Sequence, residues 1–169
     1  ITQFSQRQGY EVLTGGVVEL IYFNQGEAPW ADARFGPDPI SGFGCGSTAM
    51  SMVVSTLGTE VVDPAQMAQT AYELGYCAPG SGSYLSIVEG LAQNFGLEAY
   101  SCEELSPDFT SGGHFIVLRG ATLTGQVLVA DPNSRERSLA LWDPQLILDE
   151  LSSSRASGAP LWYVPVVSG

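Results

Sequence analysis

A continuous run of small and apolar residues, from Ser47 to Leu57, most constrains how this chain can fold. The run is longer than a typical core strand, so its length favours a helix, and Gly58 follows it as a residue that commonly ends helices. Because the run carries no charged residue, no side of the helix is suited to face water. The sequence therefore predicts a buried helix.

Helix-type segments precede strand-type segments along the chain. Residues 1–16 are polar and predict an arm, Val17–Phe23 predicts a strand, and residues 24–44 are rich in breakers and predict a loop. Further helices are expected from Asp63-Pro64 to about Leu74, over Tyr84–Phe95, and from Asp143-Pro144 to about Leu151. Further strands are expected over Leu97–Cys102, Phe115–Leu118, Val127–Ala130, Arg137–Trp142 and Leu161–Val167. This order predicts an α+β fold with separate halves, in one domain over residues 17–169.

The charge is asymmetric, with 18 acidic residues against 6 arginines, no lysine, and a net charge of −12. Such a field repels phosphate, which argues against a nucleic-acid partner and against docking on an anionic membrane. The hydrophobic fraction of 44% and the charged fraction of 14% exclude a disordered chain. No apolar run reaches the roughly 18 residues of a membrane span, so no membrane insertion is expected.

The chain has three cysteines, Cys45, Cys77 and Cys102. Either Cys77 pairs with Cys102 and leaves Cys45 as a free thiol, or all three are reduced thiols. The chain begins at Ile1, which suggests processing or a missing upstream segment. The odd cysteine count and this start favour an extracytoplasmic location, either secreted or anchored upstream.

Cys45 lies between two glycines at the start of the predicted buried helix. Flanking glycines permit close approach of a substrate, and the partial positive charge of a helix N-terminus favours a thiolate. The free N–H groups of the first turn can stabilise an oxyanion. Taken in isolation, however, a Gly-Cys-Gly sequence is more often a buried structural cysteine.

His114 is the only histidine in the chain, so it is the one candidate for a histidine general base. It precedes an apolar strand, and Asp131 ends the next strand; if these strands pair as a hairpin, Asp131 lies beside His114 and orients its ring. Asn133 is the second candidate for this orienting role. Gln25 precedes Cys45 by 20 residues and offers an amide for an oxyanion. Each residue also has a plain structural explanation: a turn histidine, an Asp-Pro turn, a polar loop glutamine.

The order glutamine, cysteine, histidine, aspartate resembles papain-like cysteine peptidases of the double-glycine, bacteriocin-processing type, and the stand-alone bacterial domains similar to them. The resemblance spans about residues 20–166, and its motifs are specific only in combination. The matching stretches are Tyr22–Gln25 with Trp30, Gly44–Met50, Gly113–Gly120 and Val127–Pro132.

The resemblance implies that Cys45 is the nucleophile, His114 the general base, Asp131 the orienting acid and Gln25 the oxyanion-hole glutamine. It implies a papain-like fold in which an N-terminal helical half packs on a C-terminal twisted antiparallel sheet, with the substrate cleft between them. The expected activity is cleavage of peptide bonds in a peptide or protein substrate, through an acyl-enzyme and without a metal or other cofactor.

The chain departs from the family in one place, because relatives usually carry an extra strand and loop before the histidine where this chain has only Glu103–Gly113. One wall of the cleft is therefore not predicted. Two other functions stay open: a catalytically silent binding module with the same fold, and an amidase or transpeptidase acting on cell-wall peptides. The oligomeric state is not predicted.

Overall fold

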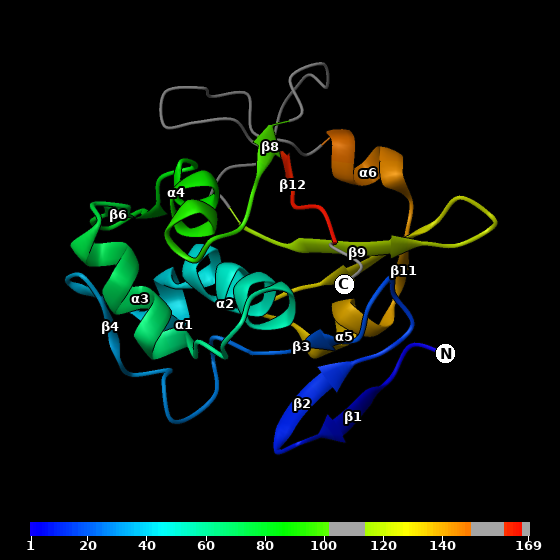
Figure 1. Cartoon of the computed structure of the whole chain (residues 1–169), viewed down its shortest axis with the longest axis horizontal. Helices are drawn as coiled ribbons and strands as arrows, with labels where there is room; N and C mark the ends of the chain where they lie inside the picture. Colours follow the sequence, from blue (N-terminus) through cyan, green and yellow to red (C-terminus); the bar gives the residue numbers. More distant parts are fainter. Residues whose placement is uncertain (102–113, 150–160, 167–169) are drawn as a thin grey trace.

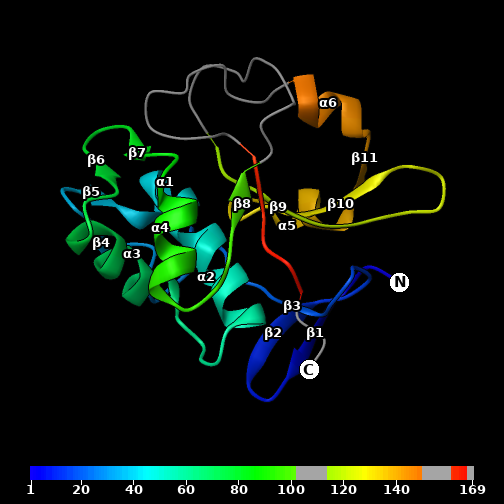
Figure 2. The same cartoon turned by 45° about the horizontal axis from the view of Figure 1, so that its top comes forward.

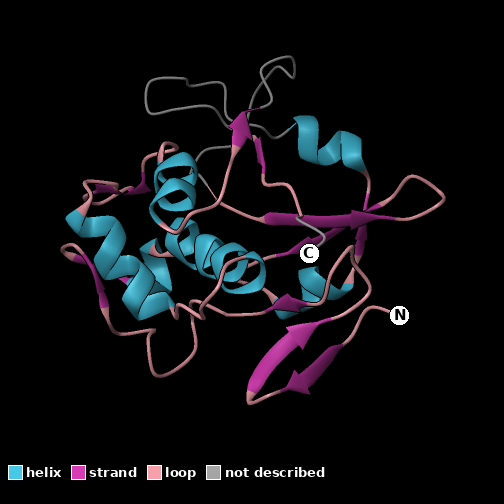
Figure 3. Cartoon of the chain, in the orientation of Figure 1, coloured by secondary structure: helices cyan, strands magenta, loops and turns pink. Residues whose placement is uncertain are grey.

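The computed structural model describes residues 1–101, 114–149 and 161–166. This part of the chain is mixed α and β, and all its strand pairs are antiparallel, which is compatible with the α+β class. Figure 1 shows most of the helices on one side of the molecule and the sheet that contains β9 on the other; Figure 3 gives the same view by type of element. The termini of the sequence-predicted segments at Cys102, Leu151 and Val167, and the stretch Glu103–Gly113, lie outside the described residues.

The predicted buried helix is confirmed as α2, Cys45–Leu57, which begins two residues earlier than expected. Most of its residues are buried. It contacts helices α3, Pro64–Glu73, and α4, Ile87–Asn94, as well as strand β3, Leu20–Ile21. Gly58 follows the helix in an extended conformation, with φ −86° and ψ −168°, so the helix does not end through a left-handed glycine.

Local signals correctly predicted the two helices that pack on α2. Helix α3, Pro64–Glu73, begins with a capping box in which Asp63 accepts a hydrogen bond from the backbone N–H of Gln66, and the side chain of Gln66 accepts one from Asp63 N–H. Gly75 follows it at φ +88°, where glycine has no steric penalty. Helix α4, Ile87–Asn94, begins three residues later than predicted.

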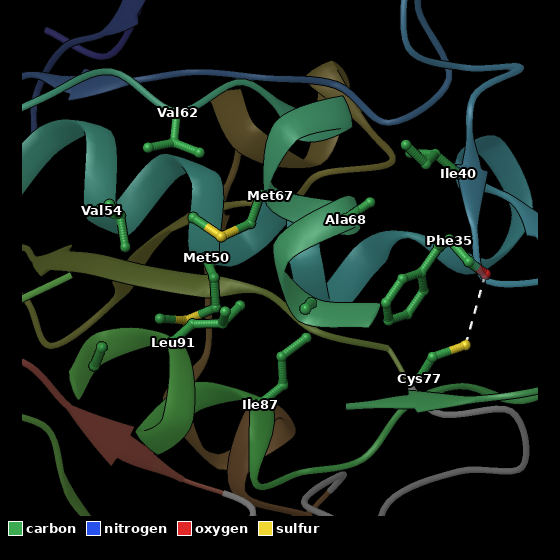
Figure 4. Close-up of a cluster of buried hydrophobic side chains, with 12 residues drawn as sticks. Phe35, Ile40, Met50, Val54, Val62, Met67, Ala68, Cys77, Ile87 and Leu91 are labelled. Atoms are coloured by element: carbon green, nitrogen blue, oxygen red, sulfur yellow. Dashed lines mark hydrogen bonds between the residues drawn. The ribbon is translucent and has the colours of Figure 1, made fainter. Parts of the chain in front are cut away.

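These helices enclose the larger apolar core (Figure 4). Its fully buried members include Phe35, Ile40, Met67, Ile87 and Leu91. Cys77 lies at the edge of this core as a free thiol and donates to the carbonyl oxygen of Phe35 at 3.6 Å. Cys102, the other member of the pair that the sequence suggested, lies outside the described residues.

The region expected to be an arm forms a β-hairpin instead. Strands β1, Phe4–Arg7, and β2, Tyr10–Leu13, pair through a turn at Gln8-Gly9, where both residues have positive φ. Strand β3, Leu20–Ile21, adds to β2 and is much shorter than the predicted strand. Leu13 at the end of the hairpin is completely buried in a second apolar cluster, which anchors the hairpin to the rest of the molecule.

The predicted loop over residues 24–44 also contains regular structure. It holds strands β4, Arg34–Phe35, and β5, Asp38–Pro39, and the short helix α1, Ile40–Phe43, which leads directly to Gly44. A second small pair, β6, Cys77–Ala78, with β7, Gly82–Ser83, lies between α3 and α4.

The sheet on the other side has the strand order β11-β10-β9. Strands β9, Val117–Ala121, and β10, Val127–Ala130, form the predicted hairpin, with β11, Leu141–Trp142, on the far side of β10. The expected strand over Arg137–Trp142 is wrong for its first half, which belongs to helix α5, Arg135–Leu139. The hydroxyl of Ser134 caps this helix by accepting from Arg137 N–H.

The remaining elements lie at the edges of these layers. Helix α6, Pro144–Asp149, follows β11 and has no buried residue. Strand β12, Trp162–Tyr163, pairs with β8, Tyr100–Ser101, rather than with β9. In Figure 2 the chain beyond β12 descends between α2 and β9.

Candidate active site

Cys45 is the first residue of α2, and its side chain is half-buried. No side chain caps the start of this helix and its first turn carries no acidic residue, so the helix N-terminus keeps its partial positive charge. A Cβ atom on Gly46 would stand 2.6 Å from the hydroxyl oxygen of Ser83 on β7, so this position has no room for a larger residue. The glycine next to Cys45 is therefore explained by close packing of β7.

His114 and Asp131 meet at one end of the β9–β10 hairpin. The register pairs Val117 with Ala130, which places the residues preceding β9 next to the residue that follows β10. Nε2 of His114 lies 2.7 Å from Oδ1 of Asp131. The predicted proximity of these two side chains is confirmed.

Asp131 is 2% exposed and is held by hydrogen bonds on both its backbone and its carboxylate. Its Oδ1 also accepts from the backbone N–H of Asn133 at 2.8 Å, and Arg137 Nη1 lies 3.3 Å from Oδ2. Burial favours the neutral acid, but these hydrogen bonds and the imidazole lower the pKa of Asp131 on balance. Asp131 is therefore an ionised partner for His114 at neutral pH.

Two residues that the sequence analysis did not identify form hydrogen bonds with the backbone of Asp131. The hydroxyl of Tyr22 donates to the Asp131 carbonyl oxygen at 2.8 Å, and the Asp131 N–H donates to the hydroxyl of Ser138 on α5 at 2.9 Å. Both contacts are buried. Asn133, the second candidate for the orienting role, donates its own backbone N–H to the Asp131 carboxylate. The group that bonds to the imidazole of His114 is the carboxylate of Asp131.

The Cys45 side chain lies in the wall of the same cavity as the imidazole of His114, close enough to contribute to the raised pKa of that ring. Since Nε2 is used by Asp131, the ring nitrogen left for sulfur is Nδ1. Burial lowers the pKa of His114, but the hydrogen bonds to Asp131 and Cys45 and the negative charge of both groups raise it to about 9. A protonated imidazole beside sulfur would stabilise a thiolate. The hydrogen-bonded pair of His114 and Asp131 thus stands beside the Cys45 thiol.

The side-chain amide of Gln25 is bonded to backbone carbonyls. Its Nε2 donates to the carbonyl oxygen of Ser41 at 3.0 Å and, more weakly, to that of Ile40 at 3.4 Å; both residues belong to α1. Its backbone N–H donates to Pro132 O at 2.7 Å. Gln25 therefore links the turn after Asp131 to the segment that leads into Cys45. No contact of Gln25 with the thiol is present among the described residues.

Cys45 and His114 lie in the wall of one cavity with a volume of about 600 Å³. Along α2 the described wall contains Cys45, Ala49, Met50, Val53, Thr56 and Leu57. On the opposite side it follows the chain from His114 through Gly120, and it also includes part of the C-terminal segment 161–166. The cavity thus extends from the thiol along one face of α2.

The described ranges offer neither a metal cluster nor a membrane span. No group of three or more His, Cys, Asp or Glu side chains in them could hold a metal ion. None of the helices in residues 1–101, 114–149 and 161–166 has the length and apolar character that crossing a bilayer requires. Searches of protein-family models, curated proteins and solved structures found no match to this chain.

Proposed function

We propose that this chain is a cysteine-dependent hydrolase that cleaves amide bonds, with a papain-like arrangement of its site. The observation that carries the proposal is that Cys45, at a helix start, and His114, at a hairpin end, line one cavity while Asp131 holds the imidazole of His114. A nucleophile, a base in contact with it and a third group that orients the base are the recurring parts of covalent acyl transfer. Peptide and protein substrates are the proposed class.

In the first step the Cys45 thiolate attacks the carbonyl carbon of the amide. A carbon–sulfur bond forms while the carbonyl π electrons move to oxygen, and the backbone N–H of Cys45 at the helix start donates to this oxyanion. When the oxyanion collapses, the carbon–nitrogen bond breaks and imidazolium His114 gives its proton to the leaving amine. The product is a thioester on Cys45.

In the second step a water molecule attacks the thioester. His114, now neutral, takes a proton from water, the carbon–sulfur bond breaks, and a carboxylic acid and Cys45 are released. Asp131 holds the imidazole with Nδ1 toward sulfur through both steps. Gln25 remains the proposed second oxyanion donor. Its Nε2 forms a short bond, 3.0 Å, to Ser41 O, but its bond to Ile40 O is weak at 3.4 Å, so one amide hydrogen is left for the oxyanion.

Thiol chemistry combined with a peptide-library digest tests this proposal. Iodoacetamide should alkylate Cys45 at pH 7 at least about tenfold faster in the wild type than in His114→Asn, because the imidazole stabilises the thiolate. Cys45→Ala should lower amide cleavage, read by mass spectrometry, at least about a thousandfold. Cys77→Ala serves as the control that removes a different free thiol.

Two outcomes would contradict the proposal. Equal alkylation of Cys45 with and without His114 would mean that the imidazole does not activate the thiol, as in a silent binding module. Cleavage that survives in Cys45→Ala would place the reaction elsewhere. Transfer of the acyl group to added amines, with little hydrolysis, would instead identify the same site as a transpeptidase.

A further inference from the structure

The shape of the cavity beside Cys45 is set by one face of α2. Its wall residues Cys45, Ala49, Val53 and Leu57 follow one another at intervals of four, which places them in one stripe along the helix. With a rise of about 1.5 Å per residue, this stripe runs for about 18 Å from the thiol. The cavity is therefore long, and the nucleophile stands at one end of it.

The wall of the cavity is mainly hydrocarbon. Besides the stripe on α2 it includes Leu85, Val88, Ile116, Leu118, Leu161 and Val164. A volume of about 600 Å³ is within the range of roughly 300–1,000 Å³ found for pockets that hold small ligands. An occupant of this space is thus apolar and large.

The polar side chains in the wall offer little to an occupant. The hydroxyl of Thr56 accepts from the backbone N–H of Ile21, and Arg119 donates through Nε to Val129 O and through Nη1 to Thr14 O. Within the described part of the chain, the hydroxyl oxygen of Ser83 and Nη2 of Arg119 have no hydrogen-bond partner, but each exposes less than 1 Å². Apart from Cys45, His114 and the exposed residues Ser81 and Tyr163, the described wall therefore offers an occupant almost no side-chain donor or acceptor.

From these observations we infer that the cavity receives a linear aliphatic acyl group, attached directly to the carbonyl that Cys45 attacks. The inference rests on the proposed cleavage of amide bonds by Cys45, but it replaces the peptide substrates proposed above with amides whose acyl part is a hydrocarbon chain. A peptide segment in the same space would bury an N–H and a carbonyl group at every residue, and the wall side chains supply few partners for them. Each such group that stays without a partner costs about 1–3 kcal/mol. A hydrocarbon chain has no such groups.

Alkyl chloromethyl ketones of increasing length test the inference with the whole chain. The Cys45 sulfur displaces chloride and forms a carbon–sulfur bond, which mass spectrometry detects without any need for turnover. From acetyl through butanoyl and octanoyl to dodecanoyl reagents, the second-order rate of inactivation should rise by up to about fourfold per methylene and level off when the cavity is full. Peptidyl chloromethyl ketones with leucine and valine form the competing series.

A substitution in the wall locates the effect. Val53→Trp fills the middle of the stripe on α2, so the ratio of the octanoyl rate to the acetyl rate should fall at least tenfold. The matched control is Leu123→Trp, which adds the same side chain at a fully exposed turn position and should leave this ratio as in the wild type.

The outcomes separate this inference from the proposed function. A rate that does not depend on chain length, a ratio unchanged by Val53→Trp, or peptidyl reagents faster than every alkyl reagent would overturn the inference. The proposed function would survive each of these results as long as iodoacetamide alkylation of Cys45 still depends on His114. Loss of that dependence would contradict the proposed function itself.

Discussion

The helical half and the sheet half of the molecule hold their site residues by different means. Helix α2, which carries Cys45, is packed in a core that includes completely buried residues from α3 and α4. By contrast, α6 beside the sheet has no buried residue, and Leu118, Leu139 and Leu141 are more than 40% exposed. There the site depends on directional hydrogen bonds to Asp131.

This difference has a physical consequence for how the site is positioned. Apolar packing fixes a helix as a rigid body but specifies no single atom, whereas hydrogen bonds fix atoms within a few tenths of an ångström. Apolar packing is enough to hold a nucleophile at a helix end. An imidazole that must face both sulfur and a carboxylate needs hydrogen bonds. Changes in the two halves should therefore affect activity and stability in different proportions.

The largest of the effects expected in this comparison comes from Asp131→Asn, which removes the carboxylate that the hydrogen bonds of the sheet half hold in place. With a model amide or thioester substrate, kcat/KM should fall by about 10²- to 10⁴-fold, because the imidazole loses the negative charge that orients it and stabilises its protonated form. Activity of the wild type should decline as pH rises through about 9, where His114 loses the proton needed by the leaving amine. Without the Asp131 charge the pKa of His114 falls, so this decline should move to lower pH.

The pH–rate profiles of the two proteins check this prediction, with Asp32→Asn as a control that removes one exposed carboxylate outside the site. Unchanged basic limbs in wild type and Asp131→Asn would show that Asp131 does not set the protonation of His114. Iodoacetamide alkylation of the wild type should not decline above pH 9, since it requires only the thiolate.

Leu91→Ala tests the helical half instead, because it removes a buried side chain from the apolar core that holds α2. Leu91 is completely buried in the core below α2, and truncation of such a side chain lowers the free energy of unfolding by about 2–5 kcal/mol. Leu146→Ala on α6, where the side chain is 44% exposed, should change it by less than about 0.5 kcal/mol. Urea unfolding measures both, and equal losses would mean that the two halves do not differ in packing.

The sequence predicted the helical half well because its signals are local. Asp63-Pro64 and Gly75 bracket α3, and the uncharged run before Gly58 identifies α2. The β9–β10 hairpin was also predictable, and with it the meeting of His114 and Asp131.

The supports of Asp131 were not predictable in the same way. Tyr22 reaches its carbonyl across 109 residues of sequence, and no periodic pattern indicates such a contact. The hairpin at residues 4–13 was missed because its strands are short and mostly polar; the Gln8-Gly9 turn was the one available signal. The role of Gln25 at the thiol stays a prediction, and the bonds of its amide to the α1 carbonyls depend on tertiary structure.

Ser138→Ala is expected to give the smallest loss of the three site and core substitutions. It compares the two halves most directly, because its effects on stability and on kcat should differ from those of Leu91→Ala. The variant leaves the Asp131 N–H buried without its acceptor, which should lower the free energy of unfolding by about 1–3 kcal/mol. Yet kcat should fall more than in Leu91→Ala, measured at a temperature where both are folded, because Ser138 acts on the position of Asp131 itself. Ser86→Ala is the control, since Ser86 precedes α4 without a side-chain capping bond. If Ser138→Ala lost stability but kept its kcat, packing of the sheet half would suffice to position the imidazole, and the contrast between the halves would not extend to catalysis.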